Sequence, residues 1–282
     1  MAKATSTRAK TSSTMVRRQL GRRLRALREA CGKTRDDVIA TRLMSKGKLE
    51  AIEHGRVMVR PGDAYELGRL YDAAPDMIEG LRQLAIATTQ EGWWQSYDDN
   101  LAAGFETYLD LESYATKLWI YEPNVIHGLL QTDAYAFSVE RASARPDLDD
   151  DTIRTHVRLR MARQQALLKR APAAVHMVLG ESALRLRVGD DVLMSAQREK
   201  LLTLAKHDAF DLRVLPEQDG AHPALLGGFA LLDFADPEDP SVAYIESYVG
   251  ARFNEKEAHV ARHREVFEVI YERARPIKEY LA

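Results

Sequence analysis

The sequence contains a single cysteine, Cys31, and no apolar run that approaches the roughly 20 residues of a membrane-spanning helix. One cysteine excludes an internal disulfide framework and is typical of a reducing compartment. Residues 1–14, MAKATSTRAKTSST, carry cations but lack the apolar segment of a secretory signal. We therefore expect a cytoplasmic protein whose N-terminal residues 1–15 form a disordered basic arm.

Sequence motifs of the common enzyme classes are also missing. There is no GxSxG, no phosphate-binding loop and no GxGxxG. The eight histidines form no metal-binding pattern. His259 and His263 are one helical turn apart, but they lack the Glu of HExxH and a third ligand. We expect no enzymatic activity, no metal and no cofactor.

A few other residues could serve a site, but a structural role is the favoured interpretation of each. Cys31 is interpreted as a core residue, as are the aromatic residues Trp93, Trp94 and Trp119. Glu181 and the Asp219–His222 segment could line a ligand site, although a structural turn is the preferred interpretation of both.

The net charge of −2 hides an uneven distribution. Residues 1–60 carry 16 Lys and Arg against 5 Asp and Glu, a net charge of +11, and the remaining residues carry −13. A basic N-terminal segment on an acidic body indicates a polyanion-binding domain joined to a domain with a different role.

The pattern TRDDVIATRLMSKGKLEAIEHGR at 34–56 predicts two short helices joined by a tight turn. Thr34 and Ser45 are N-cap residues, and Asp37 completes a capping box with Thr34. Gly55 follows the second helix at the position that favours glycine. A short helix that begins with Lys46, Gly47 and Lys48 is typical of a recognition helix, which presents cations and free backbone N–H groups to DNA.

Candidate DNA contacts follow from this geometry. Lys46 can reach guanine O6 and N7 or a phosphate, Gly47 allows close approach of the backbone, and Glu50 can accept from cytosine N4. The remaining candidates are phosphate contacts near helix ends, together with the second lysine of the recognition helix: Arg35, Ser45, Lys48, Arg56 and Arg60.

Around this pair the sequence predicts an all-α domain at 16–88. Residues 16–31 form a first helix, Asp63–Ala73 a fourth and the segment from Pro75 a fifth. Residues 20–71 resemble the Xre-type, lambda-repressor-like helix-turn-helix domain through Leu24-Arg25-x-Leu27-Arg28-Glu29, Gly32-x-Thr34, Ser45-x-x-Lys48-Leu49 and Ile52-Glu53-x-Gly55-Arg56. The resemblance implies a structural pair between Arg28 and Glu53. The chain departs from the family at the turn, where the usual glycine is Leu43.

Residues 89–282 predict a larger α+β domain, which is helical over 89–171 and α+β over 172–282. Tyr108, Leu109, Leu111, Ala115 and Leu118 recur at helical spacing. Strands are expected at Ala174–Leu179, Asp211–Leu215, Gly228–Phe234 and Ser241–Glu246, in a small antiparallel sheet. Further helices are expected at 147–170, Ser195–Ala205 and 255–275.

The body resembles the actinobacterial WhiJ-type regulators, whose C-terminal domain has no assigned chemistry. The resemblance rests on LDLESYA, IYEPNVIHGLLQTDAYA, RLRMARQQALL, LGESALR, DLRVLP, GAHP and GGFALLDFADPEDPSVAYIES. His127 stands where that family usually has proline. The resemblance implies a regulator that is developmental or antibiotic-related, or antitoxin-like, with a small partner protein.

These observations favour a DNA-binding transcriptional regulator, nucleoid-associated when bound to double-stranded DNA. A homodimer is expected because one short recognition helix reads few base pairs. The body would dimerise and bind a small partner protein or an effector. Two alternatives stay open: an antitoxin-like protein that sequesters a small neighbouring protein and regulates its own operon, and a ligand sensor.

Overall fold

The computed structural model describes residues 14–88, 104–143, 148–169, 174–235, 239–248 and 250–281. The chain divides into two compact units, Met1–Gln95 and Ser96–Ala282, and each is described by itself. The predicted arm lies outside the described residues except for Thr14 and Met15, which begin the first helix. Trp93 and Trp94 also lie outside them.

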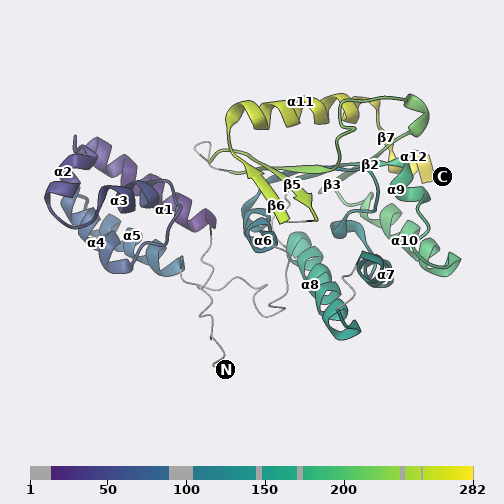
Figure 1. Ribbon diagram of the computed structural model, residues 1–282, viewed down its shortest axis with the longest axis horizontal. Helices are drawn as coiled ribbons and strands as arrows, with labels where there is room; N and C mark the ends of the chain where they lie inside the picture. Colours follow the sequence, from purple (N-terminus) through teal and green to yellow (C-terminus); the bar gives the residue numbers. More distant parts are fainter. Residues whose placement is uncertain are drawn as a thin grey trace, which may run out of the picture. The chain divides into compact units, whose positions relative to one another are not determined.

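The described part of the first unit consists of five helices (Figure 1). They are α1 (Thr14–Ala30), α2 (Arg35–Ala40), α3 (Lys46–Glu53), α4 (Pro61–Leu70) and α5 (Pro75–Ala87). The sequence predicted all five. The predicted start of α4 was two residues late, because Pro61 does not precede the helix but occupies its first position, where a missing N–H costs no hydrogen bond.

One buried cluster holds these helices together. α1 contributes Leu20 and Leu24, α3 contributes Leu49 and Ile52, and α4 contributes Leu67, all with 0% exposure. Each helix places an apolar stripe toward this centre and leaves its charged residues outside. The orientation of α3 is therefore fixed by packing rather than by its own short backbone.

The second unit contains a seven-stranded mixed sheet. Its strands are β1 (Lys117–Glu122), β2 (Ala174–Gly180), β3 (Phe210–Leu215), β4 (Phe229–Asp233), β5 (Val242–Ser247), β6 (Gly250–Asn254) and β7 (Arg275–Pro276). The order across the sheet is β6-β5-β4-β1-β2-β3-β7. β1, β2 and β3 run parallel, and the other neighbouring pairs are antiparallel.

The predicted small antiparallel sheet is therefore wrong. The sequence indicated β2 to β5 but missed β6, β7 and above all β1, because Leu118 continues the helical spacing that starts at Tyr108. In the structure the helix ends at Tyr114, and Leu118 and Ile120 are buried in a central strand. Residues 118–121 of β1 are apolar or aromatic throughout, so the sequence of β1 lacks the alternation of polar and apolar residues that identifies a half-exposed strand.

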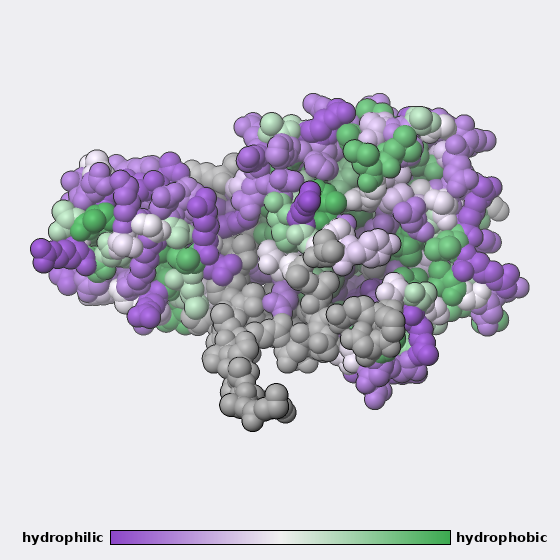
Figure 2. All heavy atoms as spheres, in the orientation of Figure 1, coloured by the Kyte–Doolittle hydropathy of each residue, from purple (hydrophilic) through white to green (hydrophobic). Residues whose placement is uncertain are grey.

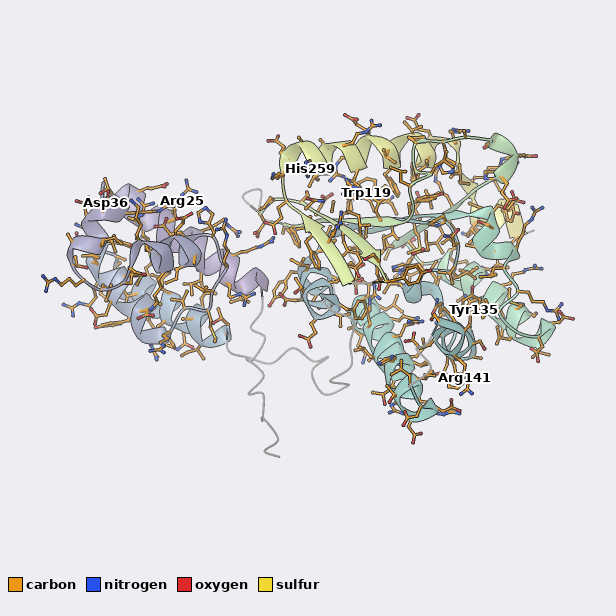
Figure 3. All side chains as sticks on the ribbon, in the orientation of Figure 1. Arg25, Asp36, Trp119, Tyr135, Arg141 and His259 are labelled. Carbon is orange, nitrogen blue, oxygen red and sulfur yellow. The ribbon has the colours of Figure 1, made fainter. Side chains whose placement is uncertain are left out.

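Helices lie on both faces of the sheet (Figure 1). They are α6 (Phe105–Tyr114), α7 (Asp133–Ser143), α8 (Asp150–Lys169), α9 (Glu181–Arg185), α10 (Asp191–Leu204), α11 (Glu257–Arg273) and α12 (Ile277–Leu281), with 3₁₀ turns η2 (Gly128–Leu130) and η3 (Glu217–Asp219). α11 covers one face, and α6, α7, α8 and α10 lie on the other side. Trp119 of β1 packs edge-on against Phe267 of α11, with 5.5 Å between ring centroids, and so joins the sheet to this helix (Figure 3).

On the opposite face a buried ion pair joins two helices. Arg163 of α8 donates to both carboxylate oxygens of Glu112 of α6, at 2.5 and 2.6 Å. Both side chains are almost fully buried, so each charge depends on the other for compensation. The pair joins α6 to α8.

Hydrophilic residues cover most of the described surface of the first unit in the view of Figure 2, with hydrophobic residues scattered among them. None of the described helices is long and apolar enough to cross a membrane.

Candidate nucleic-acid interface

The helix pair α2–α3 is built by local hydrogen bonds, as the sequence predicted. The Thr34 hydroxyl accepts from the backbone N–H of Asp37 at 3.2 Å, and the Asp37 carboxylate accepts from the N–H of Thr34 at 2.7 Å. At the start of α3 the Ser45 hydroxyl accepts from the N–H of Lys48 at 3.3 Å. These caps fix where both helices begin.

The turn between the helices uses a residue that the sequence did not single out. Arg42 has φ +61°, in the left-handed region that glycine usually occupies. Arg42 therefore adopts the left-handed conformation that a glycine would provide. It lies one position before Leu43, which stands where Xre-type domains usually have glycine. Thr41 supports the turn, because its hydroxyl donates to the carbonyl of Val38 at 2.7 Å.

α3 lies unusually close to α1 because of two glycines. A Cβ atom on Gly21 would lie 2.3 Å from the carbonyl oxygen of Ile52. A Cβ atom on Gly55 would lie 2.7 Å from the Cα atom of Arg18, and Gly55 also has φ +64°. Gly55 is thus the left-handed residue after α3 that the sequence predicted. Gly21 was missed, since a glycine inside an amphipathic helix gives no local signal of what crosses it.

Glu53 is the centre of a buried ionic cluster that spans three helices. The Nε atom of Arg28 in α1 donates to Glu53 Oε1 at 2.6 Å, and the Nε atom of Arg35 in α2 donates to Glu53 Oε2 at 2.8 Å. Burial opposes ionisation of Glu53, but the hydrogen bonds from Arg28 and Arg35 outweigh it and lower the pKa of the carboxyl. The structure thus brings together the two residues of the structural pair and adds Arg35 to them.

The two lysines of α3 face acidic residues of the neighbouring helices. Lys46 Nζ lies 3.1 Å from Asp36 of α2, and Lys48 Nζ lies 2.7 Å from Asp63 of α4. All these side chains are partly or fully exposed, so both pairs are weak in water and open to exchange. Sequence reasoning missed Asp36 and Asp63, although each stands in the first turn of its helix.

The other predicted contact residues lie around the same helix. Gly47 is exposed, with no atom within 4 Å of the position that a Cβ would occupy. Glu50 is half-buried one turn further on, and Arg56 and Arg60 are exposed in the segment that follows α3. The first turn of α3 thus offers two cationic side chains, an open backbone position and capped but partly free N–H groups.

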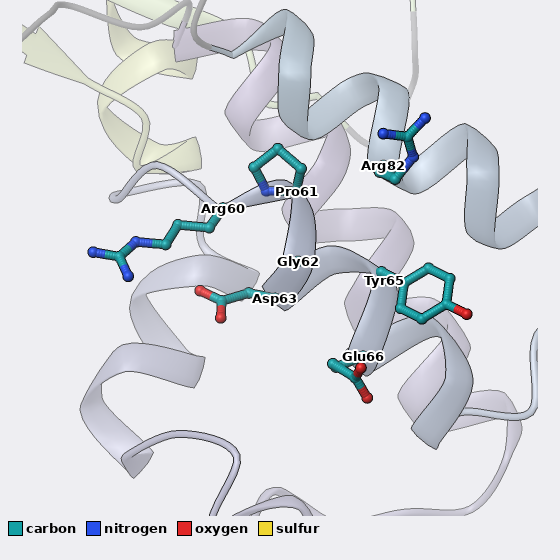
Figure 4. A pocket seen from close by; sticks show the side chains of 7 residues that line it. All are labelled: Arg60, Pro61, Gly62, Asp63, Tyr65, Glu66 and Arg82. Carbon is teal, nitrogen blue, oxygen red and sulfur yellow. The ribbon is translucent and has the colours of Figure 1, made fainter.

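A shallow pocket of about 600 Å³ adjoins this surface at the start of α4 (Figure 4). It lies between Arg60 and Asp63 on one side and Tyr65, Glu66 and Arg82 on the other. Of the two arginines in the lining, Arg82 is bonded through its Nε atom to Glu79 at 2.8 Å, and Arg60 directly precedes α4.

The described first unit is cationic overall. Residues 14–88 contain fifteen Lys and Arg against ten Asp and Glu, a net charge of +5. A cationic helical unit with exposed lysines on a capped helix can bind phosphate groups and the edges of bases in a major groove.

The weaker candidate sites have structural roles in the described residues. The Nδ1 atom of His263 is bonded to the carbonyl of His259 at 2.7 Å, and no group of three or more potential metal ligands occurs in the described part of the chain. Glu181 accepts from the N–H of Glu217 at 2.8 Å. Arg273 of α11 donates to the carbonyl of Ala221 at 3.0 Å and so holds the loop around His222.

Two family models match the chain. Residues 19–81 match a helix-turn-helix domain, and residues 105–280 match the domain of unknown function DUF5753. No curated protein and no solved structure matched the chain. The first match supports a DNA-binding regulator, and α2 and α3 lie within the matched residues. The second covers more than half of the 282 residues, and the chain therefore belongs to the DUF5753 family, with a helix-turn-helix domain at its N-terminal end.

Proposed function

We propose that the chain is a sequence-specific transcriptional regulator that reads DNA with the first turn of α3. One observation carries the proposal. In a helix-turn-helix domain, Lys46, Gly47 and Lys48 are exposed together at a helix start that Ser45 caps. In such domains the start of the second helix of the motif contacts base edges in the major groove.

The proposed contacts fall into two groups, those that can reach base edges and those that bind phosphates. Lys46 and Lys48 exchange Asp36 and Asp63 for guanine O6 and N7 or for phosphates. Glu50, one turn further on, accepts from cytosine N4. These groups supply the discrimination between sequences.

Phosphate contacts come from residues that flank α3. In the described residues, Arg35 contacts Glu53 through its Nε atom alone. The two terminal nitrogens of Arg35 can therefore bind a phosphate. Ser45 at the start of α3, and Arg56 and Arg60 after it, complete the set. These contacts set the register on the duplex and carry no sequence information.

The working form proposed is a homodimer. α3 has eight residues, and a single helix of that length reads only a few base pairs. A two-fold dimer doubles the site and multiplies specificity. The resemblance of the second unit to WhiJ-type regulators supports its assignment as the regulatory and dimerising part. No catalytic step is assigned to it.

A gel-shift assay with the DNA immediately upstream of the gene for this chain tests DNA binding. The wild type should shift this DNA at moderate salt in preference to a random duplex. The double variant Lys46→Ala/Lys48→Ala should lose the preference. Lys206→Ala/Lys278→Ala, which removes the same charge from exposed sites of the second unit, should keep it. A double variant of α3 that binds like wild type would overturn the proposal.

The dimer has its own test. Light scattering after size exclusion of the protein without DNA should give about 64 kDa, twice the chain mass of 31.8 kDa. A monomer of 31.8 kDa that shifts specific DNA as a single copy would remove the dimer and leave DNA binding in place.

A further inference from the structure

A second pocket lies within the second unit, beside the 3₁₀ turn η2. It has a volume of about 240 Å³ and is enclosed by η2, α8, α10 and the start of β3. Its walls are mainly apolar and include Leu129, Met161, Leu204 and Phe210. Three polar side chains also line it, Gln164 and Gln165 of α8 and Lys200 of α10.

The polar end of the pocket is held in place by a set of hydrogen bonds to η2 and the residue after it. Gln164 Nε2 donates to the carbonyls of Gly128 at 2.7 Å and Gln131 at 2.9 Å. Gln197 of α10 donates to the carbonyl of Leu130 at 2.8 Å and accepts from the N–H of Thr132 at 2.7 Å. The side chains at this end therefore have little freedom to rearrange.

Lys200 enters this arrangement as a cation among neutral oxygens. Its Nζ atom donates to the carbonyl of Gln131 and to Oε1 of Gln164, both at 2.6 Å. An ammonium group has three donors, so one is left after these two bonds. Neither of these two acceptor oxygens carries a charge.

The charge of Lys200 is poorly compensated. Burial lowers the pKa of the Lys200 ammonium, and Asp133 opposes this only through the longer-range attraction of its charge. A partly buried cation whose acceptors are neutral oxygens is stabilised by an anion that supplies a charged partner. An anion bound to Lys200 in this pocket would lie beside its apolar walls.

We infer that this pocket binds a small organic carboxylate, with the carboxylate against Lys200 and a hydrocarbon body against Leu129, Met161, Leu204 and Phe210. The volume is below the range of about 300 to 1,000 Å³ of drug-sized ligand sites, so the ligand is small. An inorganic anion would leave the apolar walls without a partner, and an uncharged hydrocarbon would leave Lys200 without one. The inference goes beyond DNA binding and concerns the second unit alone.

Isothermal titration of the full chain with three matched probes tests the inference. Octanoate, 1-octanol and octylammonium share a hydrocarbon chain and differ in the charge of the head group. Octanoate should bind about tenfold or more tightly than 1-octanol, because its charged head group forms a stronger hydrogen bond with the Lys200 ammonium than a neutral hydroxyl does. Octylammonium should bind weakest of the three. Equal affinity for octanoate and 1-octanol, or no binding of any probe, would overturn the inference.

Three variants locate the binding. Lys200→Met keeps most of the side-chain volume and should weaken octanoate about tenfold while leaving 1-octanol unchanged. Lys206→Met, an exposed lysine that follows the same helix, should leave both unchanged. Met161→Trp fills the pocket from α8 and should weaken both probes.

A thermal melt of each variant shows that the second unit remains folded. If Lys200→Met binds octanoate like wild type, the carboxylate is not at Lys200 and the inference fails. None of these readouts involves DNA, so their failure is distinguishable from a failure of the DNA-binding proposal.

Discussion

At the scale of single residues, Glu53 connects three helices of the first unit. Its carboxylate joins α3 to Arg28 of α1 and to Arg35 of α2 within hydrogen-bonding distance. The Arg28 side chain is 8% exposed and that of Glu53 is 0% exposed. Removal of one partner would leave a buried charge without compensation, which costs far more than the pair contributes in isolation.

Glu53→Gln should therefore destabilise the first unit by about 3 kcal/mol or more near pH 7. The pKa of Glu53 in the folded state is below the ordinary value of a glutamate. The greater stability of the wild type over Glu53→Gln is therefore fully present at pH values above that ordinary value. The advantage is lost as pH falls through the lower, folded-state pKa. Urea unfolding of both proteins at pH 7 and at pH 3 should show the gap and its narrowing.

Glu29→Gln is the matched control for this measurement. Glu29 pairs with Arg25 at 2.8 Å, but both side chains are half exposed. Water already solvates these charges, so the loss of the pair should change stability little at either pH. An equal effect of the two substitutions at pH 7 would contradict the structural role of Glu53.

For Glu122, at the end of β1, we expect the opposite dependence of stability on pH. Burial, reinforced by the charge of Glu246, raises the pKa of Glu122 to about 7. The folded state then holds a proton that the unfolded state has released, so stability falls as pH rises from the ordinary value of a glutamate through about 7. The cost of ionising this carboxyl is complete only above that value.

Glu122→Gln should remove this cost. Between pH 5 and pH 8 the variant should gain roughly 2–3 kcal/mol on the wild type in chemical denaturation of the second unit. Glu199→Gln, an exposed residue of the same unit, should leave the pH dependence of the wild type unchanged. Parallel pH profiles for wild type and Glu122→Gln would show that the carboxyl is solvated.

Individual contacts were predictable where the sequence carries a local pattern. The caps at Thr34 and Ser45 follow from residue type and spacing, and the pairing of Arg28 with Glu53 was implied by family resemblance. The contact between Lys48 and Asp63 was not predictable, because it joins residues 15 positions apart across a loop. No pattern along the chain fixes such a distance before the helices are packed.

At the scale of elements, the crossing of α1 and α3 determines where the candidate DNA-reading surface lies. Gly21 and Gly55 allow the backbones to approach more closely than any side chain would permit. A shift of α3 at this crossing would move Lys46 and Lys48 with it. Stability and DNA binding are therefore coupled through the crossing.

Gly55→Ala and Gly32→Ala separate close approach from backbone conformation. Both glycines have positive φ, +64° and +71°, so each alanine should cost about 1–2 kcal/mol for the left-handed conformation. A Cβ on Gly32 meets nothing within 4 Å, whereas one on Gly55 would lie 2.7 Å from the Cα atom of Arg18. Gly55→Ala should therefore destabilise the unit more and also weaken DNA binding.

The measurements are urea unfolding and fluorescence anisotropy with labelled duplex. Gly32→Ala should lose only stability and retain the affinity of the wild type for DNA. Identical effects of the two alanines on both readouts would show that close packing of α3 on α1 does not matter.

The elements differ in how far the sequence revealed them. The helices of the first unit have caps, prolines and one apolar face each, so their positions were predictable to within a few residues. β1 was not, because residues 118–121 are apolar or aromatic without alternation. Its pairing partners, β2 and β4, begin 57 and 112 positions after the first residue of β1. Those pairings decide the sheet order and lie outside any local window.

At the scale of the whole molecule, the two units have separate cores. The buried cluster of the first unit draws only on residues of α1 to α5 and the segments between them, and a core of the second unit lies between the sheet and α11. Two units with their own cores unfold as separate cooperative transitions when they are weakly coupled.

Differential scanning calorimetry should therefore resolve two transitions. Glu53→Gln should lower the midpoint of one, and Lys200→Met or Glu122→Gln should move only the other. A single transition that shifts as a whole with every substitution would show that the units fold as one cooperative body.

The division of charge between the ends of the chain was visible in the sequence, and it agrees with a cationic helix-turn-helix unit of net charge +5 in the described residues 14–88. The mixed sheet and the pocket beside η2 were not predictable, because both arise from segments that meet only after folding. Lys200 and Gln164 have no sequence pattern that connects them to Gln131.

Hydrogen–deuterium exchange with and without DNA tests the central claim most directly. The duplex added is taken from the DNA immediately upstream of the gene for this chain. On its addition, the backbone amides of residues 35–60 should exchange more slowly. These residues include α2, α3 and the segment after them. Amides of the sheet in the second unit should change little. Protection confined to residues 104–281, with α3 unaffected, would contradict the assignment of α3 as the helix that reads DNA.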